Sequence, residues 1–256
     1  MIRMTIAVLL ATAVGDCTLL PPDAVRQVRS AHDAYRAGRY DQAAQVLSPV
    51  ILKYGQSPEV CEALYLRALC RVQQRQMGSA RQDLERALPR SERVDLTALI
   101  RAQLGHLAFD EDRYPQAAAL YSQAEPDLPA RGPLGQVLYQ HGVSLQRSGR
   151  FADARPLFAR VFKEFASSPL AVNARRKYDW NRDYFTVQCG AFTKMESTRE
   201  VVDELRQRGI QVWVSPETRT SENFYVVQAG RHRTYAEAAA TARAIRPVVS
   251  DVFIMP

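Results

Sequence analysis

Small and large apolar residues in the first two thirds of the chain recur with a period of 37 residues. Two series of small residues lie twelve positions apart, and larger residues recur just before and just after the second series. In chain order the four series are Ala31, Ala68, Gly105 and Gly142; Tyr40, Met77, Tyr114 and Phe151; Ala43, Ala80, Ala117 and Ala154; and Leu47, Leu84, Tyr121 and Phe158. Because small residues let two helices approach closely while large ones fill the gap, the pattern predicts four helical hairpins. A further helix over 169–178, polar on one side, fits a terminal cap.

From residue 184 onward apolar and polar residues alternate, which predicts strands. Two halves match at an offset of 40, since Val187-Gln188-x-Gly190 reappears as Val227-Gln228-x-Gly230. Each half is predicted to form strand, helix, strand. Two such halves predict a βαββαβ domain, with a four-stranded antiparallel sheet and both helices on one face. The expected fold class is therefore α+β, an α-solenoid of about four hairpin repeats followed by this small domain.

The alternation also assigns side chains to the two faces of the predicted sheet. The helix-covered face takes Phe185, Val187, Cys189, Val212, Val214, Tyr225, Val227, Ala229, Val252 and Ile254. The open face takes Tyr184, Thr186, Gln188, Trp213, Phe224, Val226, Gln228 and Phe253. A slip of one residue would turn the whole apolar set outward, so the register is well specified. Aromatic residues on an uncovered face indicate a binding surface, unless the helical array docks there.

The composition is that of an ordinary globular protein of about two domains. Of the 256 residues 46% are hydrophobic and 24% charged, and no apolar run reaches the roughly 20 residues of a membrane-spanning helix. Lys and Arg number 34 against 27 Asp and Glu, a net charge of +7. This surplus is too small to indicate nucleic acid without a recognition motif.

The N-terminus has the order of a secretory signal, with Arg3 before an apolar segment over 5–15 and small residues after it. A buried N-terminal helix is the alternative. Val14-Gly15-Asp16-Cys17 resembles a bacterial lipoprotein box, with Cys17 as the lipidation candidate, but departs from it at Asp16. Cleavage after Ala13 or Gly15 without lipidation therefore remains an alternative. We expect an exported protein, either periplasmic or a membrane-anchored lipoprotein of a bacterial envelope.

The expected domains are a leader over 1–22, helical repeats with their cap over 23–178, a short connector over 179–183 and the sheet domain over 184–256. The remaining cysteines, Cys61, Cys70 and Cys189, are expected to be buried and unpaired, because the first two lie beyond disulfide reach of each other and the third faces the sheet core.

The 37-residue pattern resembles the tetratricopeptide repeat, with Pro58, Pro89, Pro129 and Pro169 closing the units. The resemblance implies a curved array whose first helices line a concave groove. Carried onto this sequence, its groove positions are His32, Tyr35, Arg36, Tyr65, His106, Phe109, Tyr139 and Arg147. Such a groove would hold an extended peptide or a helix of an envelope or division protein. The alternative for each ring is packing between repeats.

The C-terminal 73 residues resemble the SPOR domain, a bacterial module that binds peptidoglycan. The resemblance rests on Val187-Gln188-x-Gly190-x-Phe192, the helix over about 196–208, Gly209 before the second strand, and Val227-Gln228-x-Gly230. It implies a ligand, glycan strands stripped of their stem peptides, and thus a role at the division septum. The chain departs from the repeat at Arg231 and His232, and its connector is short.

Aromatic rings can stack on the apolar faces of sugars, primary amides can both donate to and accept from their polar rims, and arginines can bind lactyl carboxylates exposed by peptide removal. Arg219 and Arg233 are alternatives to Arg231 for the last role. The expected glycan-binding residues are Tyr184, Thr186, Gln188, Trp213, Phe224, Gln228, Arg231 and Phe253.

No nucleophile motif, phosphate loop or metal-ligand spacing is present, so the chain is predicted to be no enzyme and to need no cofactor or metal. Two alternatives remain. An RNA-recognition-like sheet would bind nucleic acid, but the basic-Gly-aromatic signature is missing from the third strand. A pure repeat scaffold would keep the sheet occluded. We therefore expect no nucleic-acid partner, and membrane contact only through a lipid anchor.

Overall fold

The computed structural model describes residues 20–55, 57–129, 132–219 and 221–255 of the chain, which divides into two compact units, residues 1–140 and 141–256. Most of the predicted leader, including the lipidation candidate Cys17, lies outside the described residues.

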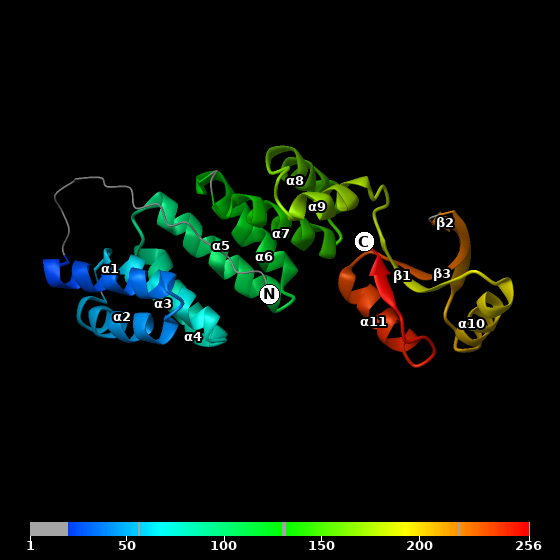
Figure 1. Ribbon diagram of the computed structural model, residues 1–256, viewed down its shortest axis with the longest axis horizontal. Coiled ribbons are helices and arrows are strands. Elements are labelled where there is room, and N and C mark those ends of the chain that lie inside the picture. The colour runs from blue at the N-terminus through cyan, green and yellow to red at the C-terminus, as the bar shows by residue number, and fades with distance from the viewer. Residues whose placement is uncertain (1–19, 56, 130–131, 220, 256) are drawn as a thin grey trace. The chain divides into compact units, whose positions relative to one another are not determined.

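The first unit consists of paired antiparallel helices (Figure 1). They are α1 (Pro22–Arg36) with α2 (Tyr40–Tyr54), α3 (Val60–Gln73) with α4 (Met77–Ala87), and α5 (Val94–Asp110) with α6 (Tyr114–Ala124). Short 3₁₀ turns follow α4 at Leu88–Arg90 and α6 at Glu125–Asp127. Helix α7 (Leu134–Arg147) runs across the boundary between the units, and α8 (Phe151–Glu164) and α9 (Leu170–Asp179) belong to the second.

The predicted hairpins are confirmed, and the small residues lie where two helices meet. Ala31, Ala43, Ala68, Ala80 and Ala117 are all 0% exposed. A Cβ atom on Gly105 would lie 2.7 Å from the ring of Tyr121, and one on Gly142 would lie 2.8 Å from the ring of Phe158. The first two repeats have Ala with Leu at the corresponding places, Ala31 with Leu47 and Ala68 with Leu84, all buried. A smaller residue on one helix thus accompanies a larger one on its partner, which preserves packing density.

Each hairpin turn contains one residue with a left-handed backbone, again at a spacing of 37. These residues are Gly38, Arg75, Asp112 and Gly149, with φ of 75°, 61°, 57° and 82°. Glycine adopts this conformation freely, whereas side-chain-bearing residues are strained by about 1 kcal/mol or more. The turn geometry is therefore kept even where the sequence does not favour it.

The sheet domain of the second unit has the predicted βαββαβ order (Figure 1). It runs β1 (Phe185–Phe192), α10 (Met195–Gln207), β2 (Val212–Arg219), β3 (Glu222–His232), α11 (Tyr235–Ile245) and β4 (Phe253–Met255). The strands are antiparallel in the order β2-β3-β1-β4. Val202 and Leu205 of α10 and Ile245 of α11 share one core with Val187 and Val227, so both helices cover the same face.

The exposure of three side chains differs from what their assigned faces lead us to expect. The register of β1 with β3 shifts between Phe185 and Val187, and in this bulge Thr186 is 0% exposed and donates its hydroxyl to the carbonyl of Ala229, 3.2 Å away. Val226, assigned to the open face, is also buried. Val214, assigned to the helix-covered face, is 37% exposed although its register partner Val227 lies in the core; Val214 is on the edge strand β2. By strand register, Thr186 shares the face of Gln188 and Val226 that of Gln228, so both are buried on the face assigned to them. Periodicity assigns a side chain to a face but does not give its burial.

Within the second unit the turn between α7 and α8 packs against the sheet domain. Phe151 belongs to the same core as Phe185, and their ring centroids lie 5.1 Å apart. The guanidinium of Arg147 lies 4.3 Å from the ring centroid of Tyr235 on α11. A Cβ on Gly149 would lie 3.0 Å from the carbonyl oxygen of Arg233. Arg147, predicted to line the partner groove, therefore stacks on the sheet domain instead.

Candidate functional site

Four open-face side chains form one row across the whole sheet. Trp213 on β2 is the register partner of Gln228 on β3, Gln228 is the partner of Gln188 on β1, and Gln188 is the partner of Phe253 on β4. With neighbouring strands about 4.8 Å apart, the row is about 14 Å long. Phe253 is 57% exposed, and the other three are partly exposed. The row thus has an aromatic ring at each end and two amides between them.

The two amides differ in how they are held. The indole nitrogen of Trp213 donates to the side-chain oxygen of Gln228 at 2.9 Å, which orients both groups and leaves the NH₂ of Gln228 as a donor. The amide of Gln188 has no hydrogen bond within the described chain, so it can both donate and accept. Together they offer the mixed donors and acceptors that a hydroxyl-rich ligand needs.

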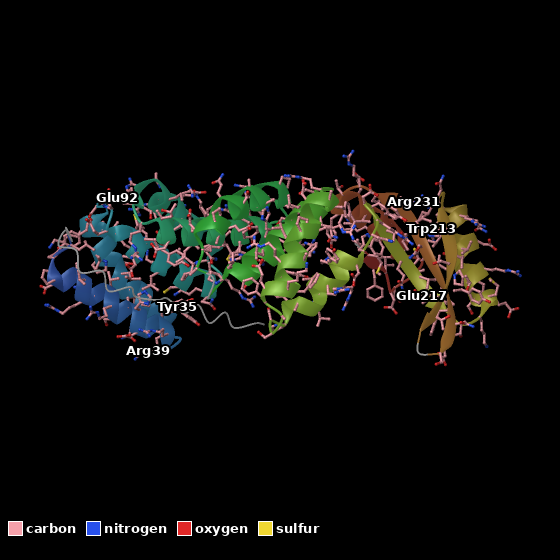
Figure 2. The ribbon with its side chains drawn as sticks, turned by 90° about the horizontal axis from the view of Figure 1, so that it is seen from above. Tyr35, Arg39, Glu92, Trp213, Glu217 and Arg231 are labelled. Carbon is pink, nitrogen blue, oxygen red and sulfur yellow. The ribbon has the colours of Figure 1, made fainter. Side chains whose placement is uncertain are left out.

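Beside this row, aromatic rings and guanidinium groups alternate. Arg231 lies 5.4 Å from the ring centroid of Tyr184 and 5.7 Å from that of Trp213, and Figure 2 shows Trp213 and Arg231 side by side. Arg182 lies 5.3 Å from the ring of Trp180 and 5.6 Å from that of Tyr184. The indole of Trp180 donates to the carbonyl of Tyr184 at 3.2 Å. These are cation–π distances, and they place five side chains in one continuous stack.

Sequence reasoning missed Trp180 and Arg182 because it assigned residues 179–183 to a connector. The sequence nevertheless contains a pattern that groups them. Trp180, Arg182 and Tyr184 are spaced by two, so extending the strand alternation upstream of β1 would have grouped them.

Other predicted glycan residues lie away from the row. Thr186 is buried, as described above, and cannot present its hydroxyl to a ligand. Phe224 pairs with Glu217 on the β2–β3 ribbon, four residues from Gln228 and hence about 14 Å along the strand. The side chain of Arg219 lies outside the described part of the chain. The row and the stack, rather than the whole face, therefore form the candidate site.

Three of the predicted groove residues in the first unit are buried between helices. Nδ1 of His106 lies 2.8 Å from the hydroxyl of Tyr121, and burial lowers the pKa of His106 to about 4. Nε2 of His32 lies 3.7 Å from a carboxylate oxygen of Glu62, and burial lowers the pKa of His32 although that carboxylate opposes the shift. Tyr65 is 5% exposed. These side chains stabilise the hairpins and are not free for a partner.

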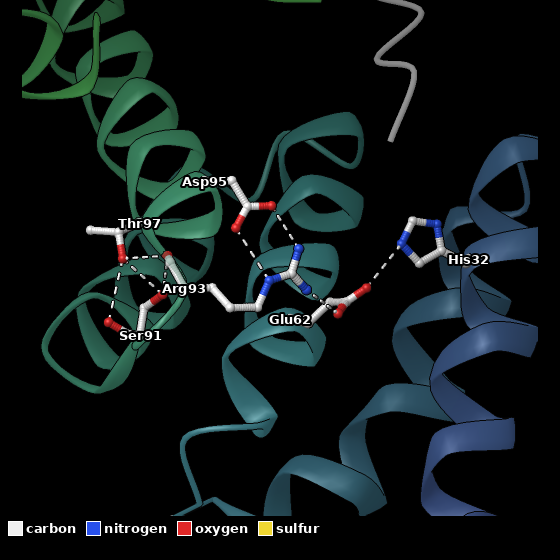
Figure 3. Close-up of polar contacts among 6 residues, drawn as sticks. All are labelled: His32, Glu62, Ser91, Arg93, Asp95 and Thr97. Atoms are coloured by element: carbon white, nitrogen blue, oxygen red, sulfur yellow. Dashed lines mark hydrogen bonds and ion pairs between the residues drawn. The ribbon is translucent and has the colours of Figure 1, made fainter. Parts of the chain in front are cut away.

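His32 begins a polar chain across three repeats (Figure 3). Glu62 on α3 also accepts from Arg93 at 3.2 Å, and Arg93 is bound by Asp95 at the start of α5. The hydroxyl of Thr97 donates to the carbonyl of Arg93 at 2.9 Å. Arg93 is therefore paired with both Glu62 and Asp95.

The other predicted groove residues are partly or fully exposed. Tyr35 packs edge-on against Tyr40 with centroids 5.4 Å apart, and Phe109 packs in the same way on Tyr114 at 5.6 Å. Each ring near the end of a first helix thus contacts the aromatic that starts the second helix. Tyr139 on α7 is half-buried, and Arg36 is exposed with its guanidinium bound to Asp33. Of the predicted groove rings, Tyr35, Phe109 and Tyr139 keep some exposed surface.

In the described chain no metal-binding cluster forms, and the cysteines are buried. Its residues contain no cluster of three His, Cys, Asp or Glu suited to a metal ion. Cys61, Cys70 and Cys189 are buried and unpaired as predicted, and burial raises the pKa of Cys70 and of Cys189 to about 12. In the same described residues, the helices are too short or too polar to cross a membrane.

Solved structures share the helical fold. MamA AMB-1 is 20% identical, with 61% of this chain covering 79% of that chain at a TM-score of 0.50. A tetratricopeptide repeat protein from Parabacteroides merdae ATCC 43184 is 14% identical, covering 62% of this chain and 60% of that one at 0.52. Pseudomonas aeruginosa pilF is 16% identical, covering 72% of each chain at 0.51. At such identities the likeness shows the fold alone. A comparison with curated proteins found no match.

Family models match both parts of the chain. The tetratricopeptide repeat model matches residues 28–94 and 139–178, and the SPOR domain model matches residues 181–254. Tetratricopeptide repeats suggest protein–protein interaction and a SPOR domain suggests peptidoglycan binding. Both are binding domains without catalytic activity, which is consistent with the prediction that the chain is not an enzyme. The chain therefore contains tetratricopeptide repeats, followed by a SPOR domain over residues 181–254.

Proposed function

We propose that this protein is a non-enzymatic component of a bacterial cell envelope, which binds peptidoglycan glycan strands lacking stem peptides through the open face of its SPOR sheet. The observation that carries the proposal is the row Trp213, Gln228, Gln188 and Phe253, which crosses all four strands on the face opposite α10 and α11.

The row supports a linear saccharide as the ligand. Its length of about 14 Å suits a short stretch of sugars laid across the strands. Phe253, 57% exposed, offers a ring face to the C–H side of a sugar, while Gln188 and Gln228 offer amides to hydroxyl and acetamido groups. A shallow face of this kind should bind at about micromolar strength, or roughly 8 kcal/mol.

The tetratricopeptide repeats are proposed to bind an envelope or division protein. The half-exposed rings of Tyr35, Phe109 and Tyr139 support an aromatic contact surface on the first helices of three repeats. Buried His32, Tyr65 and His106 take no direct part. Export, with a lipid on Cys17 as one form of attachment, is part of the proposal and rests on the N-terminal sequence pattern.

The glycan site is tested by co-sedimentation with intact and amidase-treated wall sacculi, using the double variant Trp213→Ala with Gln188→Ala. The wild-type protein should pellet with treated sacculi, and the double variant should lose at least tenfold in affinity, because one end and one central amide of the row are removed. Phe224→Ala, on the ribbon away from the row, is the matched control and should bind normally.

Two results would contradict the proposal. Unchanged sedimentation of the double variant would exclude the row as the site. Binding of single-stranded RNA in preference to treated sacculi would favour the nucleic-acid alternative.

A further inference from the structure

Two arginines beside the row have no carboxylate partner among the described residues. Arg182 and Arg231 are exposed, and neither forms an ion pair within the described residues. Some other arginines of this chain do bind carboxylates, for example Arg67 and Arg71, which both bind Asp83 at 2.7 Å. The sheet face therefore carries two positive charges that no carboxylate of the described chain pairs with.

The aromatic rings hold these two guanidinium groups in place. Arg231 lies near the rings of both Tyr184 and Trp213, and Arg182 near those of Trp180 and Tyr184. A guanidinium beside aromatic rings still has several N–H groups, of which a carboxylate can accept two. Because the rings restrict each arginine before a ligand arrives, less conformational freedom is lost on binding.

The nearby guanidinium groups also reduce the ring surface that a sugar can contact. Trp213 and Tyr184 already contact guanidinium groups, so those parts of their surfaces are not available to the apolar face of a sugar. At this side of the site the ligand meets positive charge in place of bare hydrocarbon. A neutral saccharide gains little here, whereas an acidic one gains charge-assisted hydrogen bonds.

The spacing of the two arginines suits repeated acidic groups on one polymer. Each guanidinium carbon lies within 5.6 Å of the Tyr184 centroid, so the two lie no farther apart than the sum of their distances to it, about 11 Å. Carboxylates on nearby sugars of one strand can reach both.

We propose that Arg182 and Arg231 bind carboxylates of the saccharide, so that the SPOR face selects an acidic glycan over a neutral one of the same backbone. This inference rests on the proposed glycan-binding function. It also assigns a binding role to Arg182 in the segment before β1.

The test uses two forms of one ligand. Glycan strands released by amidase treatment carry free carboxylates, and a second portion has them converted to neutral amides with carbodiimide and ethanolamine. The full-length wild-type protein should bind the acidic strands about tenfold or more tightly than the amidated ones, a difference of about 1.4 kcal/mol. The preference should shrink as salt is raised.

Arg182→Gln and Arg231→Gln should each weaken binding of the acidic strands about tenfold and leave binding of the amidated strands unchanged. Arg199→Gln, which removes an exposed charge from α10 on the helix-covered side, is the matched control and should preserve the preference. Thermal unfolding of each variant, followed by tryptophan fluorescence, identifies any that binds poorly because it has lost its fold.

Equal binding of both glycans by the wild-type protein would overturn the role of the arginines while leaving glycan binding intact. A loss of affinity for both glycans in folded Gln variants would also overturn it, since the arginines would then act only by positioning the rings. Binding of neither glycan by the wild-type protein would instead reject the proposed function.

Discussion

At the scale of single residues, burial decides which polar side chains serve packing and which can meet a ligand. His106 and Tyr121 form a buried pair in the first unit, whereas Gln188 and Phe253 keep exposed surface on the sheet. His106 was grouped with ligand-binding residues because its helix position is that of a groove residue. Its 8% exposure follows from the close approach of α5 and α6 at Gly105.

Buried His106 should make the stability of the first unit depend on pH. Its pKa of about 4 lies below the ordinary 6.5, so the unfolded chain binds more protons between these values and the free energy of unfolding falls as the pH is lowered through that window. The loss is at most about 1.4 kcal/mol per pH unit. His106→Gln should flatten this dependence in urea unfolding followed by circular dichroism.

The same substitution at His232, in the second unit, should leave the pH dependence of the first unit unchanged. An equally steep acid loss in the His106→Gln protein would show that other groups cause it.

At the scale of elements, the hairpin turn is the feature that recurs most regularly in backbone conformation. Gly38 and Gly149 occupy the same left-handed position of the first and fourth repeats. They differ in surroundings, because nothing lies within 4 Å of a Cβ placed on Gly38, while one on Gly149 meets the backbone of Arg233. A substitution at Gly38 therefore tests backbone strain alone, whereas one at Gly149 also tests the packing of the turn against the sheet domain.

Gly38→Ala should destabilise the protein by about 1 kcal/mol through backbone strain alone. Gly149→Ala should cost clearly more and should lower the midpoint seen by tryptophan fluorescence, since both tryptophans, Trp180 and Trp213, lie in the second unit. If both substitutions shifted that midpoint equally, the contact of the α7–α8 turn with Arg233 would contribute nothing to stability.

At the scale of the whole molecule, the compact units do not follow the limits of the two family matches. The SPOR match begins at residue 181, yet the second unit begins at residue 141 and includes the last hairpin. Phe151, the first residue of α8, shares a core with Phe185 and Tyr235 of the sheet domain. The last repeat thus contributes to the stability of the domain that bears the candidate site.

Phe151→Ala should therefore destabilise the sheet domain by about 3–5 kcal/mol, the usual range for removing a buried phenylalanine ring. Urea unfolding monitored by tryptophan fluorescence measures this loss. Phe162→Ala, where the ring packs on Tyr178 between α8 and α9, is the comparison within the same hairpin and should affect the sheet less. An unaltered fluorescence transition in Phe151→Ala would mean that the sheet domain folds independently of the hairpin.

The amino-acid sequence by itself determined the repeat period, the hairpins and the βαββαβ order, because these depend on spacings of residues close in the chain, such as Ala31 with Ala43 or Val187 with Gln188. It also placed Trp213, Gln228, Gln188 and Phe253 on one face. Only the tertiary structure decided that these four align in one row, since register between strands is a long-range property.

Tertiary packing likewise buried Thr186 in a bulge, placed Arg147 on Tyr235 and brought Arg182 into a stack with Tyr184. Each outcome depends on tertiary contacts between segments of the chain. Local periodicity does not predict such contacts.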